Sequence, residues 1–269
     1  MTIEAFAPAK INLSLHVTGQ RPDGYHLLDS LVLFADVGDR LWLDKATDMS
    51  VEVFGPFAQG VPKDNSNLVW KAAQLAGWSG RIRLEKNLPH GAGIGGGSSD
   101  AAAVLRALGA DDQGLNLGAD VPVCHLSSAA RMTGIGEVVE KVNGLPNLFA
   151  VLANPQIHMP TPAVFQNLTN KQNPKMDKLP NLMESDPEGF FEWLGDQRND
   201  LEIPAIKAVP AISNVLAALG GLQGARITRM SGSGATCFAL FDDRTLAIKG
   251  AGTLQKIYPE WWVVDCALN

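Results

Sequence analysis

Glycine residues crowd into one short segment, "PHGAGIGGGSS" from Pro89 to Ser99, and a run of helix-forming residues follows at once. Small residues let backbone N–H groups approach an anion, and the first turn of a helix adds the positive end of its dipole. No Gly-Lys-Ser/Thr sequence follows, so the segment is not a Walker loop. Taken alone, it favours a phosphate-binding loop and is also compatible with a hinge or packing loop ahead of a helix.

Polar residues near the N-terminus form a second candidate site. Lys10 and Asn12 lie two residues apart on the polar side of an alternating segment, so they project toward one region of space. A solvent-exposed outer face of a strand would show the same pattern. Shortly after, "PDGYHLL" places Asp23, Tyr25 and His26 together, and an aromatic face beside a hydrogen-bonding ring suits a flat heterocycle. An ordinary turn with a half-buried tyrosine would have the same composition.

Two further segments carry isolated polar groups. Asp120 is the only charged residue in "LNLGADVPVC". Such a carboxylate is a candidate general base if a cation keeps it ionised, although Asp before Val-Pro is also typical of a helix N-cap, and the two roles are compatible. In "MSGSGATCF", Gly232 and Gly234 flank Ser233. This turn permits a close approach of backbone to phosphate, and it also permits a plain hairpin.

These residues must be positioned by a mixture of strands and helices. Alternation predicts a strand over residues 4–17, and further strands are expected at 27–35, 39–44, 49–54 and 81–89. Helices are expected at 65–77 and 100–108. A second half begins with a strand at 145–155, continues through an irregular stretch at 167–186 and helices at 187–195 and 211–221, and ends with a strand–turn–strand at 225–241, a helix and a strand at 261–268. The predicted class is α+β, with a boundary near residue 148.

Composition excludes several classes of function. The net charge is −6 and the basic residues are scattered, which argues against nucleic-acid binding. The three cysteines, Cys124, Cys237 and Cys266, lie far apart in apolar runs, which predicts reduced, buried thiols and offers no zinc spacing. No leader-like segment or membrane-spanning run is evident. We therefore expect a cytoplasmic protein without a membrane partner, and the sequence identifies no protein partner.

Three of these motifs occur in a characteristic order. "PAKINL" near the N-terminus, "PHGAGIGGGSSDAA" in the middle and "MSGSGATCF" near the C-terminus together resemble the GHMP kinases. The resemblance spans nearly the whole chain. It implies the GHMP kinase fold, with a ribosomal-protein-S5-like N-terminal domain over residues 1–148 and a C-terminal GHMP kinase domain over residues 149–269. ATP and a second substrate would bind in the cleft between them.

A finer resemblance follows from "APAKINLSLHVTGQRPDGYHLLDSLV", "GADVPVC" and "MPTPAVF". These segments are similar to the GHMP kinases of the non-mevalonate isoprenoid pathway that act on 4-diphosphocytidyl-2-C-methyl-D-erythritol (CDP-methylerythritol). By that similarity, Lys10 and Asp120 form the catalytic pair and Asn12 holds the methylerythritol phosphate portion. The residues implied to engage the cytosine, or to lie near it, are Tyr25, His26, Thr161 and Phe165.

The resemblance also implies which residues bind ATP, with Mg²⁺ as its companion ion. They are Pro89, His90, Gly91, Ala92, Gly93, Ile94, Gly95, Gly96, Gly97, Ser98 and Ser99. The metal ligands are not identified by the sequence, and Ser99 is one candidate. Asp120 would accept the proton of the 2-hydroxyl group of the acceptor, while Lys10 keeps Asp120 ionised and offsets charge on the phosphate oxygens.

The sequence departs from the family pattern at two places. Ile94 stands where leucine is usual, which conserves volume. The spacer of 19 residues between Asp100 and Asp120 is short for the family. Three alternative functions stay open: a kinase for another small alcohol such as homoserine or mevalonate, a nucleotide-binding regulator without turnover, and an NAD-dependent oxidoreductase that uses "GAGIGG" as a dinucleotide fingerprint.

Overall fold

The computed structural model describes residues 1–110, 114–157, 159, 161–180 and 186–269. Its strands are β1 (Thr2–Asn12), β2 (His16–Gln20), β3 (His26–Lys45), β4 (Ser50–Phe54), β5 (Gly80–Glu85), β6 (Ala130–Gly134), β7 (Val138–Lys141), β8 (Leu148–Asn154), β9 (Ile227–Met230), β10 (Cys237–Phe241) and β11 (Trp262–Leu268). Its helices are α1 (Leu68–Leu75), α2 (Gly96–Ala107), η1 (Gly114–Asn116, a 3₁₀ turn), α3 (Val121–Leu126), α4 (Thr161–Gln166), α5 (Pro187–Asp196), α6 (Glu202–Ala208), α7 (Ala211–Gly220) and α8 (Arg244–Ile257).

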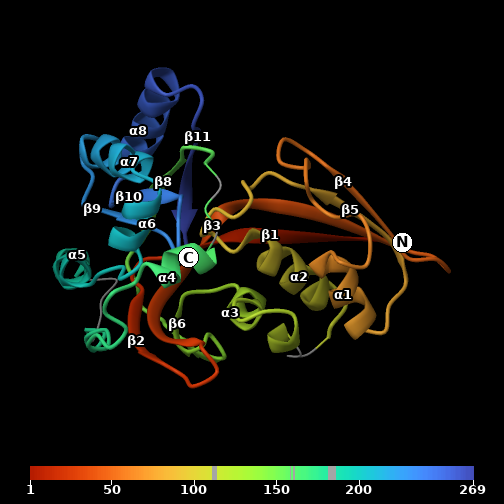
Figure 1. Ribbon diagram of the computed structural model, residues 1–269. Coiled ribbons are helices and arrows are strands. Elements are labelled where there is room, and N and C mark those ends of the chain that lie inside the picture. The colour runs from red at the N-terminus through yellow and green to blue at the C-terminus, as the bar shows by residue number, and fades with distance from the viewer. Residues whose placement is uncertain (111–113, 158, 160, 181–185) are drawn as a thin grey trace.

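The long strand β3 connects the two ends of the molecule (Figure 1). Its hydrogen-bonded partners change along its length, from β2 and β6 at one end to β1 and β5 at the other. Near its middle, Ala35 pairs with Leu268 of β11, which joins it to the path β11-β8-β10-β9. The described strands thus form one mixed α+β framework, in which only β4 and β5 pair in parallel.

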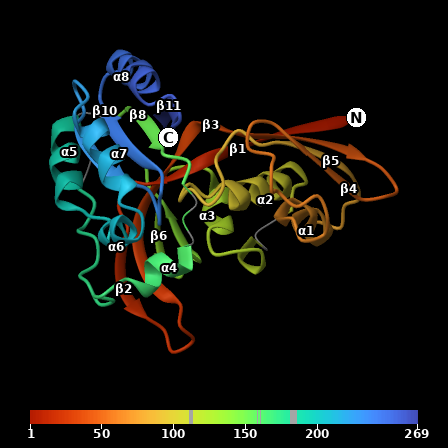
Figure 2. The ribbon, with the colours of Figure 1, turned by 45° about the horizontal axis from the view of Figure 1, so that its top comes forward.

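Helices cover the two ends of this sheet separately. In Figures 1 and 2, α1 and α2 lie along the β1, β3, β4 and β5 end, while α7 and α8 lie against β8, β10 and β11. Side chains alternate across β8 as a strand requires, with Val151 packing toward the α7 and α8 side and Leu152 toward the α5 side. The α5 side also receives Ile11 of β1 and Phe190 of α5, so one core cluster contains residues from both halves of the chain.

The predicted strand over residues 4–17 is interrupted in the structure. β1 ends at Asn12 and β2 begins at His16. Leu13 still donates its backbone N–H to the carbonyl of Leu31 in β3, but Leu15 donates to the carbonyl of Arg198 and accepts from the N–H of Asp200. Leu15 thus pairs with a distant loop in place of β3. Residues 7–17 are buried on both faces of the strand, so the alternation in the sequence does not indicate that Leu15 pairs with residues 198 and 200.

Most of the other predicted elements are present, with shifted ends. The two strands expected at 27–35 and 39–44 are one continuous strand, β3. The helix expected at 100–108 begins earlier, at Gly96, because Gly95 adopts φ 66° and the glycines themselves form its first turn. Residues 167–180 have no regular structure, as expected, while residues 181–185 of that prediction lie outside the described part of the chain.

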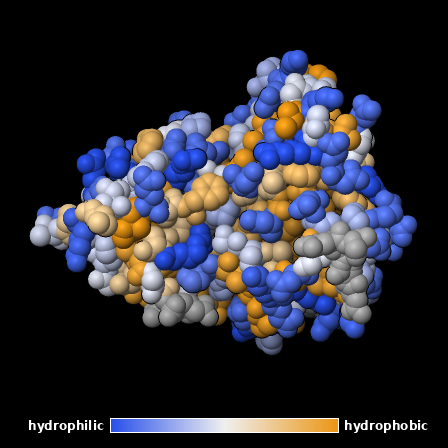
Figure 3. Space-filling view, turned by 180° about the vertical axis from the view of Figure 1, so that it is seen from behind, coloured by the Kyte–Doolittle hydropathy of each residue, from blue (hydrophilic) through white to orange (hydrophobic). Residues whose placement is uncertain are grey.

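The distribution of hydrophobic residues and the burial of the cysteines can be compared with what the sequence predicts. Figure 3 shows hydrophobic and hydrophilic residues interspersed over one face of the molecule. No helix in the described residues is long and apolar enough to cross a lipid bilayer. The three cysteines are free and buried, as the sequence predicts, and burial raises the pKa of the Cys124 thiol to about 12.

Candidate active site

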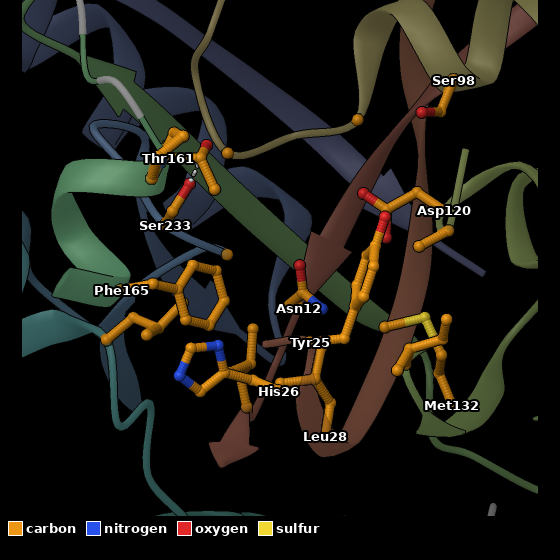
Figure 4. Close-up of a pocket in the computed structure, with 18 of the residues that line it drawn as sticks. Asn12, Tyr25, His26, Leu28, Ser98, Asp120, Met132, Thr161, Phe165 and Ser233 are labelled. Carbon is orange, nitrogen blue, oxygen red and sulfur yellow. Dashed lines mark hydrogen bonds between the residues drawn. The ribbon is translucent and has the colours of Figure 1, made fainter. Parts of the chain in front are cut away.

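A cavity of about 860 Å³ collects the candidate residues from several segments of the chain. Its lining includes residues of β1 and β2, the turn before β3, the glycine segment, the start of α3, α4, and the turn between β9 and β10. In Figure 4, Ser98 and Asp120 lie on one side of the cavity and His26 and Phe165 on the other, with Asn12 between them. Every residue that the sequence analysis placed in the catalytic pair or near the second substrate lines this cavity: Lys10, Asn12, Tyr25, His26, Asp120, Thr161 and Phe165.

Lys10 and Asp120 form an ion pair at the cavity wall. Lys10 Nζ lies 2.7 Å from Asp120 Oδ1, with the lysine side chain 5% and the aspartate side chain 35% exposed. Lys10 is therefore not on a solvent-exposed strand face. Asp120 does occupy the N-cap position of α3, but its side chain accepts no capping hydrogen bond. Its carboxylate thus faces the cavity and the lysine, and the shortened spacer before it still places it against Lys10.

The glycine segment packs backbone to backbone against its neighbours. The backbone N–H of Lys10 donates to the carbonyl of Ile94 over 2.9 Å, and the N–H of Thr236 donates to the carbonyl of Ala92 over 3.1 Å. A Cβ atom on Gly93 would lie 2.3 Å from the carbonyl oxygen of Ser231, and one on Gly232 would lie 2.6 Å from the carbonyl oxygen of Gly93. Gly93 and Gly232 are thus required for close packing between the glycine segment and the turn between β9 and β10. The sequence had left such a packing role as one alternative for each of these two segments.

Seven of the eleven residues implied to bind ATP line the cavity: Gly91, Ala92, Gly93, Gly95, Gly96, Gly97 and Ser98. Four do not. Pro89 is buried, and His90 is exposed with its ring facing the carbonyl of Phe57. Ile94 packs in the core, and the buried Ser99 hydroxyl donates to the carbonyl of Pro8 over 2.7 Å. Ser98, at the start of α2, is the serine whose hydroxyl faces the cavity.

A buried cluster of charges holds the base of this segment. Lys86 Nζ donates to both Asp39 and Asp100, and Asp39 Oδ1 also accepts the backbone N–H groups of Asn87 and Leu88. Burial alone would lower the pKa of Lys86, but the two carboxylates outweigh it and raise that pKa. Burial raises the pKa of Asp100, although Lys86 opposes this shift. The cluster ties the residue after β5 to Asp39 of β3 and to Asp100 of α2.

Aromatic rings form the opposite wall of the cavity. The His26 ring stacks on Phe165 with centroids 4.6 Å apart and an interplanar angle of 24°. Tyr25 is 58% exposed, which is unusual for a large aromatic residue lining a cavity. Thr161 and Ser233 share a hydrogen bond of 2.8 Å between their hydroxyl groups, which links α4 to the turn after β9 (Figure 4).

Sequence reasoning missed several lining residues on this side. Lys171 and Gln20 line the cavity and are joined by a hydrogen bond of 3.1 Å from Lys171 Nζ to Gln20 Oε1. Burial, and next the positive charge of Lys171, lower the pKa of His26. Lys171 belongs to an irregular segment without periodicity, so no pattern in the sequence marks it as part of a site.

The described residues contain no group of three or more His, Cys, Asp or Glu side chains able to hold a metal ion by themselves. The cavity nevertheless offers the Asp120 carboxylate and the Ser98 hydroxyl. Mg²⁺ usually takes one or two protein oxygens and completes its shell with substrate phosphates and water. This donor set therefore fits Mg²⁺ that arrives with a nucleotide, and it does not fit a metal held by the protein alone.

Comparisons with known proteins give consistent results. Residues 67–139 match the GHMP kinases N terminal domain, and residues 178–260 match the GHMP kinases C terminal domain. The chain is 54% identical to a 4-diphosphocytidyl-2-C-methyl-D-erythritol kinase of Dinoroseobacter shibae, covering 99% of this chain and 95% of the relative. It is 51% identical to an enzyme of the same name from Cereibacter sphaeroides, covering 97% of each.

Solved structures agree. A crystal structure of a 4-(cytidine 5'-diphospho)-2C-methyl-D-erythritol kinase superposes with a TM-score of 0.77 at 33% identity, covering 99% of both chains. A homoserine kinase from Cytophaga hutchinsonii superposes with a TM-score of 0.66 at 18% identity, covering 98% of this chain and 94% of the other. At that identity the second likeness concerns the fold alone.

Proposed function

Because the chain belongs to the 4-diphosphocytidyl-2-C-methyl-D-erythritol kinases of the GHMP kinase family, we propose that it transfers the γ-phosphoryl group of ATP to the 2-hydroxyl group of CDP-methylerythritol. The reaction belongs to the non-mevalonate route of isoprenoid biosynthesis. The observation that carries the proposal within this molecule is the Lys10–Asp120 ion pair, which lies in one cavity with the glycine segment and the aromatic wall.

Phosphoryl transfer needs alignment of the two substrates and neutralisation of phosphate charge. In the proposal, Asp120 accepts the proton of the attacking hydroxyl group. Lys10, at 2.7 Å, pairs with the Asp120 carboxylate and would balance charge that develops on the transferred group. The pair can do both because Lys10 is nearly buried while Asp120 is partly open to the cavity.

The triphosphate of ATP would bind at the start of α2. The helix has 12 residues, and its first turn consists of Gly96, Gly97 and Ser98, all of which line the cavity. Backbone N–H groups of a first helical turn have no partner within the helix, and they carry the positive end of its dipole. Mg²⁺ bound to the phosphates would supply further positive charge, with Ser98 and Asp120 as the protein oxygens within the cavity.

The second substrate would occupy the remainder of the cavity. Its cytosine would lie against the aromatic wall formed by Tyr25, His26 and Phe165, with Thr161 at the edge. Asn12, fully buried and two residues after Lys10, would bind the methylerythritol portion beside the ion pair. This order along the cavity, from helix start to ion pair to aromatic rings, supports transfer from ATP at the helix start to a hydroxyl group beside the ion pair.

The proposal is tested by measuring ADP formation by the purified protein with ATP and Mg²⁺, with and without CDP-methylerythritol. We expect turnover that depends on CDP-methylerythritol and a product phosphorylated at the 2-hydroxyl group, identified by ³¹P and ¹³C NMR. Asp120→Asn should lower kcat by about 100- to 10,000-fold, because loss of a positioned general base costs that much. Asp196→Asn, at the exposed end of α5, is the matched control and should leave kcat unchanged.

Two results would contradict the proposal in different ways. Absence of turnover with CDP-methylerythritol, or equal turnover with homoserine or mevalonate, would overturn the substrate. Wild-type kcat in Asp120→Asn would overturn the general base while leaving the substrate in place. Thermal unfolding of each variant separates loss of chemistry from loss of fold.

A further inference from the structure

Asn12 is fully buried, yet its side-chain oxygen has no hydrogen-bond partner among the described residues. A buried polar atom without a partner costs free energy, so such atoms usually complete a hydrogen bond to water or a ligand. Asn12 lines the cavity, and Figure 4 places it between Asp120 and the aromatic rings. The free Oδ1 can therefore accept a hydrogen bond from a molecule in the cavity.

The orientation of this amide is set by a neighbour outside the cavity lining. Asn12 Nδ2 lies 2.8 Å from the hydroxyl oxygen of Ser30, and that hydroxyl donates to the carbonyl of Ser14 over 2.5 Å. A carbonyl oxygen only accepts, so the single proton of Ser30 is committed to Ser14, and Ser30 can only accept from Asn12. The NH₂ group of Asn12 must then face Ser30, and Oδ1 must face away from it.

We propose that Ser30 is a positioning residue for phosphoryl transfer, because it fixes the Asn12 amide so that Oδ1 accepts from a hydroxyl group of the acceptor substrate. This inference rests on the proposed function. Lys10 and Asn12 share one side of β1, so the hydroxyl group bound by Asn12 lies beside the Lys10–Asp120 pair. An amide free to turn over would present its NH₂ group to that hydroxyl and lose the orientation of the acceptor.

The backbone of Asn12 is held by other contacts. Its N–H donates to the Ser231 hydroxyl over 3.1 Å, and that hydroxyl donates to the carbonyl of Gly93 over 3.0 Å. Removal of the Ser30 hydroxyl leaves these bonds in place. A change at Ser30 should consequently act on the direction of the amide and leave β1 and the glycine segment where they are.

A double-mutant cycle tests the inference by steady-state kinetics of the full-length protein with CDP-methylerythritol and ATP. Ser30→Ala should lower kcat/KM for CDP-methylerythritol by about tenfold, the effect of one hydrogen bond, and leave KM for ATP unchanged. Ser30→Thr retains the hydroxyl and should restore kcat/KM. In an Asn12→Ala background, Ser30→Ala should cause no further loss, because Ser30 acts only through Asn12.

Ser128→Ala is the matched control, since the Ser128 hydroxyl is buried and has no partner among the described residues. It should leave kcat/KM unchanged.

If Ser30→Ala does not fold, Ser30→Cys keeps nearly the same volume with a poor hydrogen-bond acceptor and should show the same loss of kcat/KM. Wild-type kcat/KM in the folded variant, or an equal loss in the Asn12→Ala background, would overturn the role of Ser30. Both results presuppose wild-type turnover, so they leave the proposed function intact.

Discussion

At the scale of single residues, His26 shows how the surroundings set the chemistry of a side chain that lines the cavity. Its ring is stacked on Phe165, and its Nε2 atom is buried without a partner among the described residues. Burial first, and the charge of Lys171 second, lower the pKa of His26 below its usual value near 6.5. The ring is therefore neutral at pH 7, with one nitrogen that donates and one that accepts, which suits the polar edge of a base.

We predict that Lys171→Met raises the pKa of His26 toward its ordinary value, because one of the two causes of the downward shift is removed. An NMR titration of the His26 ring protons measures this directly. Protonation then begins at a higher pH in the variant, so KM for CDP-methylerythritol should rise more between pH 8 and pH 6 than in the wild type. Lys175→Met, in the same irregular segment, is the control. An unchanged His26 pKa in Lys171→Met would refute the electrostatic contact.

The motif resemblance predicted that Lys10, Asp120 and the aromatic rings belong to one site, and they do line one cavity, while their roles stay predictions. The residues that support them could not be predicted. Ser30 stands in the apolar run "LLDSLVLFA" and reads as a residue of the core, which it is, with 0% exposure. Its role depends on a hydrogen bond to Ser14, a contact between strands that spacing does not encode. The resemblance implied that both Ser98 and Ser99 face the site, whereas only Ser98 lines the cavity and the Ser99 hydroxyl donates to the carbonyl of Pro8.

At the scale of elements, the glycine segment is positioned by main-chain contacts with two other segments. The backbone N–H of Lys10 in β1 donates to the carbonyl of Ile94. The turn between β9 and β10 contacts Gly93 so closely that no side chain fits at that position. Gly93 also has φ +74°, a conformation that L-residues adopt at a cost.

Gly93→Ala is expected to lower stability by about 2 kcal/mol or more and kcat/KM for ATP by at least about tenfold, because either the segment or the turn at Ser231 must move. Thermal denaturation and steady-state kinetics measure the two effects. Gly252→Ala is the matched control: it lies in α8 with open space around its Cβ position and should gain about 0.5–1 kcal/mol without a change in activity. A Gly93→Ala enzyme with normal stability and kinetics would show that the contact is not needed.

At the scale of the whole molecule, one sheet path and one shared core connect the halves of the chain. β3, from the first half of the chain, pairs with β11, from the second half. Ile11 and Leu33 pack in the same core cluster as Phe190 and Phe238. The division at residue 148 stays a prediction, but these contacts couple the residues before and after it.

We therefore expect a single cooperative unfolding transition, with equal calorimetric and van't Hoff enthalpies in differential scanning calorimetry. Phe190→Ala removes a fully buried ring from the shared cluster and should cost about 3–5 kcal/mol while keeping one transition at a lower Tm. Two resolved transitions in the wild type, of which only one moves in Phe190→Ala, would refute the coupling.

The α+β class and most element positions could be predicted because periodicity and glycine or proline punctuation are local signals. The connections between elements could not. The break between β1 and β2 depends on pairing with residues 198–200, and the union of two expected strands into β3 depends on partners that change along its length. Both are long-range contacts, which a local pattern does not contain.

The backbone packing of the glycine segment also bears on drug resistance. Resistance to an inhibitor commonly arises when a side chain in contact with the compound is exchanged for another. Where Gly93 and Gly232 meet, the wall of the cavity is main chain, and any side chain added there would lie within 2.6 Å of a carbonyl oxygen. An inhibitor anchored to these main-chain atoms would leave the organism few substitutions that weaken the drug without also dismantling the enzyme.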